Sequence, residues 1–281
     1  MYDETLFLGI GLYDIFLVLA CLSALVVFDK FSKLRNMSVE ANKFYYILGL
    51  AAIVGGIFSA MLFQSVYNWI DNGFQDFKFQ GLTFLGGVIG GALIFLLGHF
   101  FVAKKEVQKE LWKVAEIAPA CVFFAHGVGR IGCFFGGCCG GIETDFFLGI
   151  TFPEAPHKTH PTQLYESAFL FAMFFVILYM NRKDIRYSLP VYCLSYGVFR
   201  FLLEFLRGDE RGALVPGLSP SQMMSIILVA VGLGLLALKY FREKYPEKMK
   251  YVLSHLFEQT ENEVISKDQQ ENESDDNQKE A

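Results

Sequence analysis

Residues 8–28 read LGIGLYDIFLVLACLSALVVF and contain one acidic residue, Asp14, and no basic residue. A helix needs about 20 predominantly apolar residues to cross a bilayer, and this stretch is long enough. Comparable apolar stretches recur along the chain. They are Phe44–Tyr67, Leu82–Ala103, Val114–Phe135, Leu164–Met180, Leu189–Leu206 and Ser219–Tyr240. The sequence therefore predicts an all-α integral membrane protein, built as a bundle of seven transmembrane helices.

The composition agrees with a membrane-embedded chain. Of the 281 residues, 53% are hydrophobic and 19% are charged, whereas soluble domains carry about 25% charged residues. The formal net charge is −5, and nine of the 29 acidic residues follow Leu256. This distribution excludes a basic surface for nucleic acid. We expect a membrane domain over residues 1–245 and a largely disordered acidic tail over residues 246–281.

Basic residues alternate between the two sides of the predicted bundle. Segments after the first, third, fifth and seventh spans carry 16 lysines and arginines, and the opposite side carries four. Cytoplasmic loops are enriched in these residues, so the N-terminus is predicted outside and the C-terminus in the cytoplasm. The acidic start Tyr2-Asp3-Glu4 lacks the positive region of a signal peptide, so the first helix is predicted to be retained.

Five ionisable residues lie within the predicted spans, where an isolated charge costs at least ~2.5–3.5 kcal/mol. They are Asp14, Arg130, Glu166, Arg200 and Glu204. Tyr196, Arg200 and Glu204 share one helix face, because they are spaced four residues apart. An ion pair between Arg200 and Glu204 can be purely structural. The glycines around Arg130 favour a binding site instead, and two arginines suit the phosphate of a phospholipid headgroup.

Four segments carry a more specific pattern. They are GVGRIG at Gly127–Gly132, HPTQLYE at His160–Glu166, YGVFRFLLEFLR at Tyr196–Arg207 and LSPSQMMS at Leu218–Ser225. In this order they resemble the bacterial phosphatidylglycerol–prolipoprotein diacylglyceryl transferases. That family moves a diacylglyceryl group from phosphatidylglycerol to the lipobox cysteine in the signal peptide of a prolipoprotein, and glycerol phosphate leaves. The resemblance implies a multi-pass protein of the bacterial cytoplasmic (inner) membrane among membrane lipids, with an outward-facing active site. The sequence contains no visible cofactor or nucleotide motif, so we expect no cofactor and assign no metal.

The resemblance also implies roles for individual residues. Arg130 would hold the headgroup phosphate, and Arg200 would stabilise charge on the departing phosphate. Glu204 would orient Arg200, and Tyr196 would form a hydrogen bond near the same group. The other residues expected to bind substrate are Gly86, Gly87, Gly132, Cys133, His160, Gln163, Tyr165 and Glu166.

Three positions depart from the family pattern. Leu85 stands where the family usually has a histidine, Cys133 stands for an asparagine, and Cys138 stands for an acidic residue. A catalytic base is therefore needed elsewhere, because the acceptor thiol attacks as a thiolate. His126 lies four residues before Arg130 and is the candidate base. The alternative is a histidine packed among polar neighbours.

The cysteines Cys133, Cys138 and Cys139 have C-x4-C-C spacing in a glycine-rich turn. Three interpretations remain open: small packing residues, a disulfide on an oxidising outer face, or a reactive thiolate or metal site that includes His126. The spacing is not a regular zinc spacing, which disfavours the metal.

The main functional prediction is the diacylglyceryl transfer itself. One alternative is a paralogous lipid-group transferase that uses another acceptor. A second alternative is a membrane protein that binds or transports phospholipid without catalysis. An ion carrier is disfavoured, because the charges gather at one face of the predicted bundle and form no relay across it.

Overall fold

The protein is described by a computed structural model that covers residues 11–75, 77–79, 81, 83–152, 156–208 and 217–246. These residues form helices joined by loops, with isolated β-bridges but no strand among them. The chain divides into two units, Met1–Val229 and Ala230–Ala281, which are described separately. The predicted tail, 246–281, lies outside the described residues apart from residue 246.

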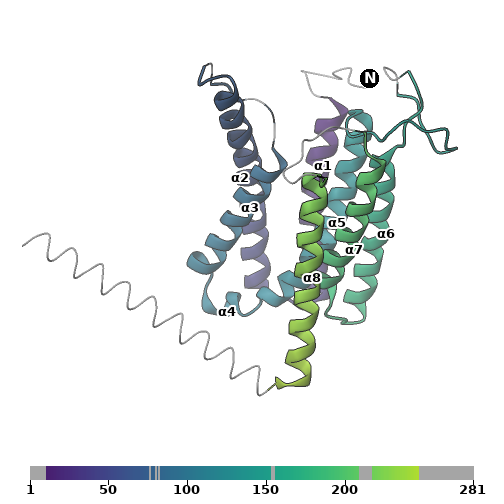
Figure 1. Ribbon diagram of the computed structural model, residues 1–281. Coiled ribbons are helices and arrows are strands. Elements are labelled where there is room, and N and C mark those ends of the chain that lie inside the picture. The colour runs from purple at the N-terminus through teal and green to yellow at the C-terminus, as the bar shows by residue number, and fades with distance from the viewer. Residues whose placement is uncertain are drawn as a thin grey trace, which may run out of the picture. The chain divides into compact units, whose positions relative to one another are not determined.

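The first unit contains the helices shown in Figure 1. They are α1 (Leu12–Leu34), α2 (Val39–Asp71), α3 (Phe84–Leu97), the π-helix η1 (Gly98–Val102), α4 (Lys105–Gln108), α5 (Leu111–Phe135), α6 (Thr162–Arg182), α7 (Ser188–Leu203), the 3₁₀-helix η2 (Glu204–Leu206) and the start of α8 (Pro220–Lys244). The described part of the second unit continues α8, where Lys244 Nζ donates to the Tyr240 hydroxyl at 2.8 Å.

Within the described residues, six helices are long and apolar enough to cross a membrane: α1, α2, α5, α6, α7 with η2, and α8. The prediction of an all-helical membrane protein is confirmed at this level. The predicted third span, Leu82–Ala103, corresponds to a shorter apolar helix at Gly86–Val102. It includes the end of α3 and the π-helical turn η1 at Gly98–Val102. The count of seven spans stays a prediction.

The outer faces of these helices are apolar. Val18, Leu22 and Val26, spaced four residues apart along α1, are 57%, 54% and 54% exposed. In water such a stripe would be unfavourable, but lipid tails solvate it without cost. The polar residues of the site therefore lie in a bundle whose surroundings are hydrocarbon.

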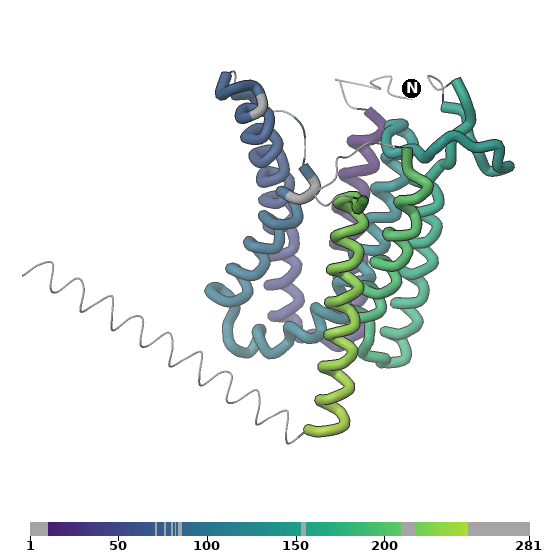
Figure 2. The backbone as a smooth tube through the Cα atoms, in the orientation of Figure 1, coloured from purple at the N-terminus to yellow at the C-terminus, as the bar shows by residue number. Residues whose placement is uncertain are grey.

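Helices α2 and α3 pack closely as a pair, which the tube in Figure 2 shows. Small residues make this contact possible. A Cβ added to Gly56 would lie 3.0 Å from the Gly87 carbonyl oxygen, and one added to Gly91 would lie 3.1 Å from the Ala52 carbonyl oxygen. Glycines commonly let membrane helices approach in this way.

Helix α5 packs against α1, α6 and α7 and holds the centre of the first unit. The main core cluster joins α1, α5 and α6, and its buried members are Val27, Phe31, Ile117, Ala120, Phe123, Leu170, Phe174, Ile177 and Met180. The same three-helix contact continues toward the C-terminal end of α5. This packing brings the polar residues of α5, α6 and α7 together.

Gly132 is where α1 approaches α5, and it provides a stability prediction. A Cβ there would lie 2.7 Å from Phe16 Cβ, whereas a Cβ at Gly129 in the same helix meets nothing within 4 Å. Both Gly→Ala changes gain the same helix propensity, so their difference isolates the steric effect. We expect Gly132→Ala to be about 1–3 kcal/mol less stable than Gly129→Ala in detergent unfolding experiments. Equal stabilities would contradict the close α1–α5 contact.

Candidate functional site

Glu166 is the centre of the candidate site. Its side chain is 0% exposed and lies one turn into α6, which begins directly after Pro161. Arg130 Nε lies 2.8 Å from Glu166 Oε2, and the Tyr196 hydroxyl donates to Glu166 Oε1 at 2.8 Å. His126 Nε2 is 3.6 Å from the same Oε1 atom. One buried carboxylate thus joins residues of α5, α6 and α7.

Close packing of α5 and α6 makes this contact possible. The Ser167 hydroxyl donates to the Gly127 carbonyl oxygen at 2.9 Å, and a Cβ on Gly127 would lie 3.0 Å from the Phe171 ring. His126 and Arg130 are one helical turn apart on α5, so both reach the same carboxylate. Of the glycines flanking Arg130, Gly129 borders open space, while Gly132 serves helix packing.

Arg200 forms the second polar group of the site. Its NH1 lies 2.7 Å from Glu204 Oε2, and its NH2 donates to the Ser221 hydroxyl at 2.9 Å. Glu204 Oε1 accepts from the Ser219 hydroxyl at 2.7 Å. The guanidinium is buried, so its carboxylate partner and the serine hydroxyl hold it in one orientation.

Ser219 also caps the start of α8. The Gln222 backbone N–H donates to the Ser219 hydroxyl at 3.2 Å, and the Ser219 N–H donates to Gln222 Oε1 at 3.1 Å. This is a capping box, which Ser-x-x-Gln spacing before an apolar run signals in a sequence. Ser219 and Ser221 were not among the predicted site residues, although the capping-box spacing was present in the sequence.

The two groups are electrostatically coupled. Arg130 and Arg200 both interact with Glu166 and with His126. Tyr196 and Arg200 come from the same face of α7, one turn apart, and link the two groups. The arrangement holds two guanidinium groups beside two carboxylates in a largely apolar bundle, where electrostatic interactions are stronger than in water.

The turn that follows α5 is hydrogen-bonded to the start of α6. Thr162 Oγ1 donates to the Cys139 carbonyl oxygen at 2.8 Å, and Gln163 Nε2 donates to the Cys138 carbonyl oxygen at 2.6 Å. Both donors are buried at the start of α6. Cys139 has a φ of 67°, which is uncommon for a residue other than glycine. The HPTQLYE segment therefore holds the cysteine turn in place.

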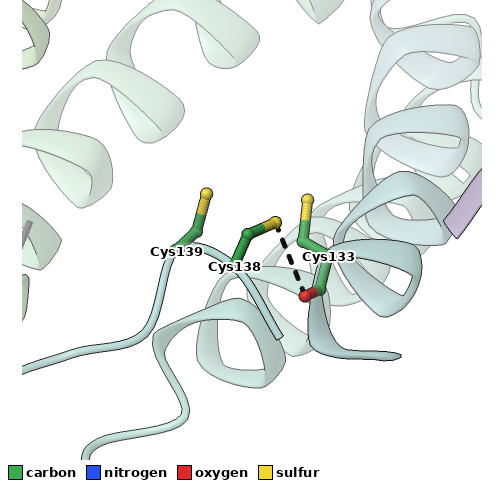
Figure 3. Close-up of side chains that lie close together, drawn as sticks. All are labelled: Cys133, Cys138 and Cys139. Atoms are coloured by element: carbon green, nitrogen blue, oxygen red, sulfur yellow. Dashed lines mark hydrogen bonds between the residues drawn. The ribbon is translucent and has the colours of Figure 1, made fainter. Parts of the chain in front are cut away.

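The three cysteines of this turn lie together. Their Sγ atoms are all within 4.8 Å of one another, and Cys138 Sγ donates to the Cys133 carbonyl oxygen at 3.7 Å. Figure 3 shows the three sulfur atoms directed to the same side of the turn. His126 does not belong to this group, because it contacts Glu166 and the Tyr196 ring. A metal site that includes His126 is therefore not what the structure presents.

The cysteines of the loop differ in acidity. Hydrogen bonds from Cys133 and Cys138, together with the Arg207 guanidinium, lower the pKa of the Cys139 thiol. The corresponding hydrogen bonds and burial raise the pKa of Cys138. Arg207, at the end of η2, thus interacts with the Cys139 thiol.

The remaining predicted residues lie in other places. His160 Nδ1 and the Tyr165 hydroxyl are 3.2 Å apart, and the His160 carbonyl oxygen accepts from the Gly141 N–H at 2.8 Å, so both shape the loop after α5. Asp14 Oδ2 accepts from the Gly11 N–H at 3.0 Å and caps α1.

The segment around the family's histidine position serves helix packing in the described residues. Gly86 and Gly87 contact α2: their added Cβ atoms would lie 2.6 Å from Phe63 Cβ and 3.4 Å from Ala60 Cβ. None of these contacts involves Arg130 or Glu166. The side chain of Leu85 lies outside the described residues.

Comparison with known proteins shows the family of the chain. The sequence profile of the prolipoprotein diacylglyceryl transferase family matches residues 4–238. The chain belongs to the prolipoprotein diacylglyceryl transferase family. It is 32% identical over 244 residues to a phosphatidylglycerol–prolipoprotein diacylglyceryl transferase of Clostridium tetani, covering 83% of this chain and 94% of the relative. It is 38% identical to transferase 2 of Clostridium perfringens, covering 57% and 62%, and 31% identical to the Campylobacter curvus enzyme, covering 83% and 90%.

In this diacylglyceryl transferase family member, the four sequence segments meet around the buried charges. Gly127–Gly132 supplies Arg130, His160–Glu166 supplies Glu166, and Tyr196–Arg207 supplies Arg200. Leu218–Ser225 supplies the serines that hold Arg200 and Glu204. Segments that are far apart in the sequence therefore form one polar site.

Proposed function

We propose that the chain transfers the diacylglyceryl group of phosphatidylglycerol to the lipobox cysteine thiol of a prolipoprotein and releases glycerol phosphate. The observation that carries this proposal is the pair of buried arginines, Arg130 and Arg200, each oriented by its own carboxylate. A membrane-embedded pair of guanidinium groups suits an anionic lipid headgroup. The family membership of the chain agrees with this reaction.

Arg130 is the residue that we propose binds the phosphate. Among the described residues it contacts Glu166 through Nε, the inner edge of the guanidinium. A guanidinium oriented through Nε can offer its two terminal nitrogens to phosphate oxygens in a bidentate contact. Its side chain is 13% exposed, and Gly129 beside it leaves open space for a headgroup.

Arg200 is the residue that we propose stabilises the leaving group. Glu204 and Ser221 hold both terminal nitrogens of its guanidinium, so the cation is preorganised and does not need to reorient during the reaction. Preorganised charge acts on the transition state, where negative charge on the departing phosphate grows. Ser219 and Glu204 act as positioning residues through Arg200.

His126 is proposed as the proton acceptor for the incoming thiol. In the reaction the thiol S–H bond breaks and its proton moves to the imidazole. The thiolate then attacks the glyceryl carbon attached to the phosphate oxygen, so a C–S bond forms as the C–O bond breaks. Glycerol phosphate leaves with the bonding electrons. Glu166, 3.6 Å from His126 Nε2, stabilises the protonated ring.

We further propose seven membrane spans with the N-terminus outside, in the bacterial cytoplasmic membrane, with the site toward the outer face. The domain would extend over residues 1–245 and be followed by the acidic cytoplasmic tail. The 16-to-four distribution of basic residues supports this orientation. The donor lipid would enter between helices with its acyl chains still in the bilayer, and the acceptor peptide would arrive from the outer face.

Transfer in vitro tests this proposal. Purified protein, phosphatidylglycerol vesicles and a lipobox peptide should give a lipidated cysteine and free glycerol phosphate. Arg200→Ala should lower the rate by at least about 10²-fold, because it removes a preorganised cation. Arg186→Ala removes a surface arginine paired with Asp184 and should retain the rate.

Two results would contradict the proposal. One is an intact lipid and peptide after incubation with folded wild-type protein, which would leave a phospholipid-binding protein without catalysis. The other is lipidation of a peptide whose cysteine is replaced by serine, which would indicate a different acceptor chemistry. A normal rate in Arg200→Ala would remove Arg200 from the mechanism.

A further inference from the structure

The three thiols of Cys133, Cys138 and Cys139 have no role in the reaction described above. We propose that these three cysteines form a binding site for one thiophilic divalent cation, Zn²⁺, with a fourth coordination position left open. Three protein ligands and one open position are the arrangement of catalytic zinc sites, whereas structural zinc sites have four protein ligands. The site consists of residues of this chain alone, and its binding of metal does not depend on the transfer reaction.

The distances suit a three-thiolate site. The Sγ atoms lie within 4.8 Å of one another. Tetrahedral zinc with Zn–S bonds of about 2.3 Å requires S···S separations of about 3.8 Å. The remaining contraction is below about 1 Å for each pair, which rotation of the cysteine side chains provides. C-x4-C-C is an irregular spacing in sequence, but the turn brings the sulfur atoms together in space.

The backbone of the turn holds the sulfur atoms in position. Besides the hydrogen bonds from Thr162 and Gln163, the Ile142 N–H donates to the Leu206 carbonyl oxygen at 2.9 Å. The turn is therefore fixed on both sides, by α6 and by η2. Its thiols gather before any ligand binds, which lowers the entropy lost on binding.

The surrounding charges suit three thiolates. Arg207 interacts with Cys139, and Arg130 interacts with Cys133 and Cys139. Three thiolates and one Zn²⁺ carry a net charge of −1, and the neighbouring guanidinium groups offset it. Thiolate is the form that binds metal. Arg130 and Arg207 are therefore close enough to offset part of the negative charge of a three-thiolate ligand set.

Other interpretations of the cysteines fit less well. Packing does not explain Cys138, which is exposed, whereas Cys193 in α7 is buried and is used for packing. A disulfide would join two of the three sulfur atoms and leave one thiol beside an arginine. The mutual proximity of all three is what a single metal ion requires. Thiolate ligands select soft or borderline cations such as Zn²⁺ over magnesium or calcium.

The open position has a use if the proposed function holds. The acceptor thiol would displace a water ligand and form a Zn–S bond, and its proton would pass to His126, the proton acceptor of the proposed reaction. The Zn–S bond would break as the C–S bond forms. A thiol that coordinates zinc is deprotonated. Because Cys133 is one turn beyond Arg130, the activated sulfur would lie beside the phosphate site. This step rests on the proposed function, and the site itself does not.

Metal uptake tests the site without any lipid. Reduced protein in detergent, desalted without air, should take up one equivalent of Zn²⁺, measured by elemental analysis and by competition with a chromophoric chelator. Co²⁺ should give thiolate-to-metal charge-transfer absorption. Cys138→Ala should bind at least about 100-fold more weakly, because losing even an outer-shell partner costs 10–100-fold. Cys21→Ala, in α1, is the matched control and should bind as the wild type does.

Three results would overturn the site. They are no stoichiometric uptake by the folded wild-type protein, equal affinity in Cys138→Ala, and a disulfide within the group whose reduction yields no metal binding. Circular dichroism of each variant establishes that it is folded. A protein that transfers the diacylglyceryl group but binds no Zn²⁺ would overturn this inference alone. A protein that binds Zn²⁺ but transfers nothing would overturn the proposed function and leave the site intact.

Discussion

Replacing Arg130 by glutamine should lower kcat/KM for diacylglyceryl transfer by about 10³-fold or more. Loss of one preorganised hydrogen-bond donor costs about 10²–10³-fold in enzymes, and Arg130 supplies a full charge and two donors to the phosphate. The rate of glycerol phosphate release, measured at several phosphatidylglycerol concentrations, checks this. Arg130→Lys keeps the positive charge but loses the planar guanidinium. Its rate should therefore lie between the rates of the wild type and of Arg130→Gln.

A second variant separates catalysis from folding. Arg130→Gln leaves the carboxylate of Glu166 buried without its 2.8 Å partner. The double variant Arg130→Gln/Glu166→Gln removes both charges together, and replacing a whole buried pair is often tolerated. The double variant should fold but transfer nothing. A double variant that is folded and regains the wild-type rate would exclude Arg130 from phosphate binding.

Replacing Glu166 by alanine should have the largest effect on stability. Glu166 is 0% exposed and contacts Arg130, Tyr196 and His126. Removing one partner of a buried ion pair costs about 3–5 kcal/mol, because the other charge stays buried without compensation. Unfolding in detergent should show a destabilisation of that size, together with loss of transfer.

A surface glutamate is the matched control for this change. Glu106 is 77% exposed and pairs with Lys109 at 2.9 Å. Exposed pairs contribute about 0–1 kcal/mol, so Glu106→Ala should unfold close to the wild type. Glu166→Gln, which retains an acceptor for the Tyr196 hydroxyl, should lie between the two variants. Equal stability of Glu166→Ala and Glu106→Ala would mean that the carboxylate does not hold the three helices together.

The comparison of these variants also distinguishes the two arginines. Arg130 and Arg200 lie near the same carboxylate, but each has its own ion-pair partner. Loss of Arg200 leaves Glu204 with the Ser219 hydroxyl as a hydrogen-bond donor. Loss of Arg130 leaves Glu166 with the neutral Tyr196 hydroxyl and with His126. Loss of Arg130 should therefore destabilise the helix bundle more than loss of Arg200.

Some site residues are readable from local patterns, and others are not. Tyr196, Arg200 and Glu204 share a helix face by spacing, and the Arg200–Glu204 pair follows from that spacing. The Ser219–Gln222 capping box was also readable, although it was not assigned. Asp14 was grouped with the ionisable residues within the predicted spans, but it caps its own helix. From the sequence alone, an acidic residue that caps a helix cannot be distinguished from an acidic residue of a functional site.

The fold class depends on local properties of the sequence. Apolar runs of about 20 residues can satisfy their backbone hydrogen bonds in lipid only as helices or closed barrels, and their length and composition favour helices. The apolar runs of α1, α2 and α5 to α8 follow this rule. The family was also readable, because each of its four segments is an unbroken run of residues in the sequence.

Only the tertiary structure decided which charges meet. Glu166 pairs with Arg130 rather than with Arg200, because glycine and serine contacts bring α5 and α6 together at that level. The cysteine group was similarly hidden, since its spacing disfavours a metal and only the folded turn brings three sulfur atoms within 4.8 Å. Helix formation depends on residues that are neighbours in the chain. Ion pairs and ligand groups depend on how helices pack, and that packing is set by many contacts at once.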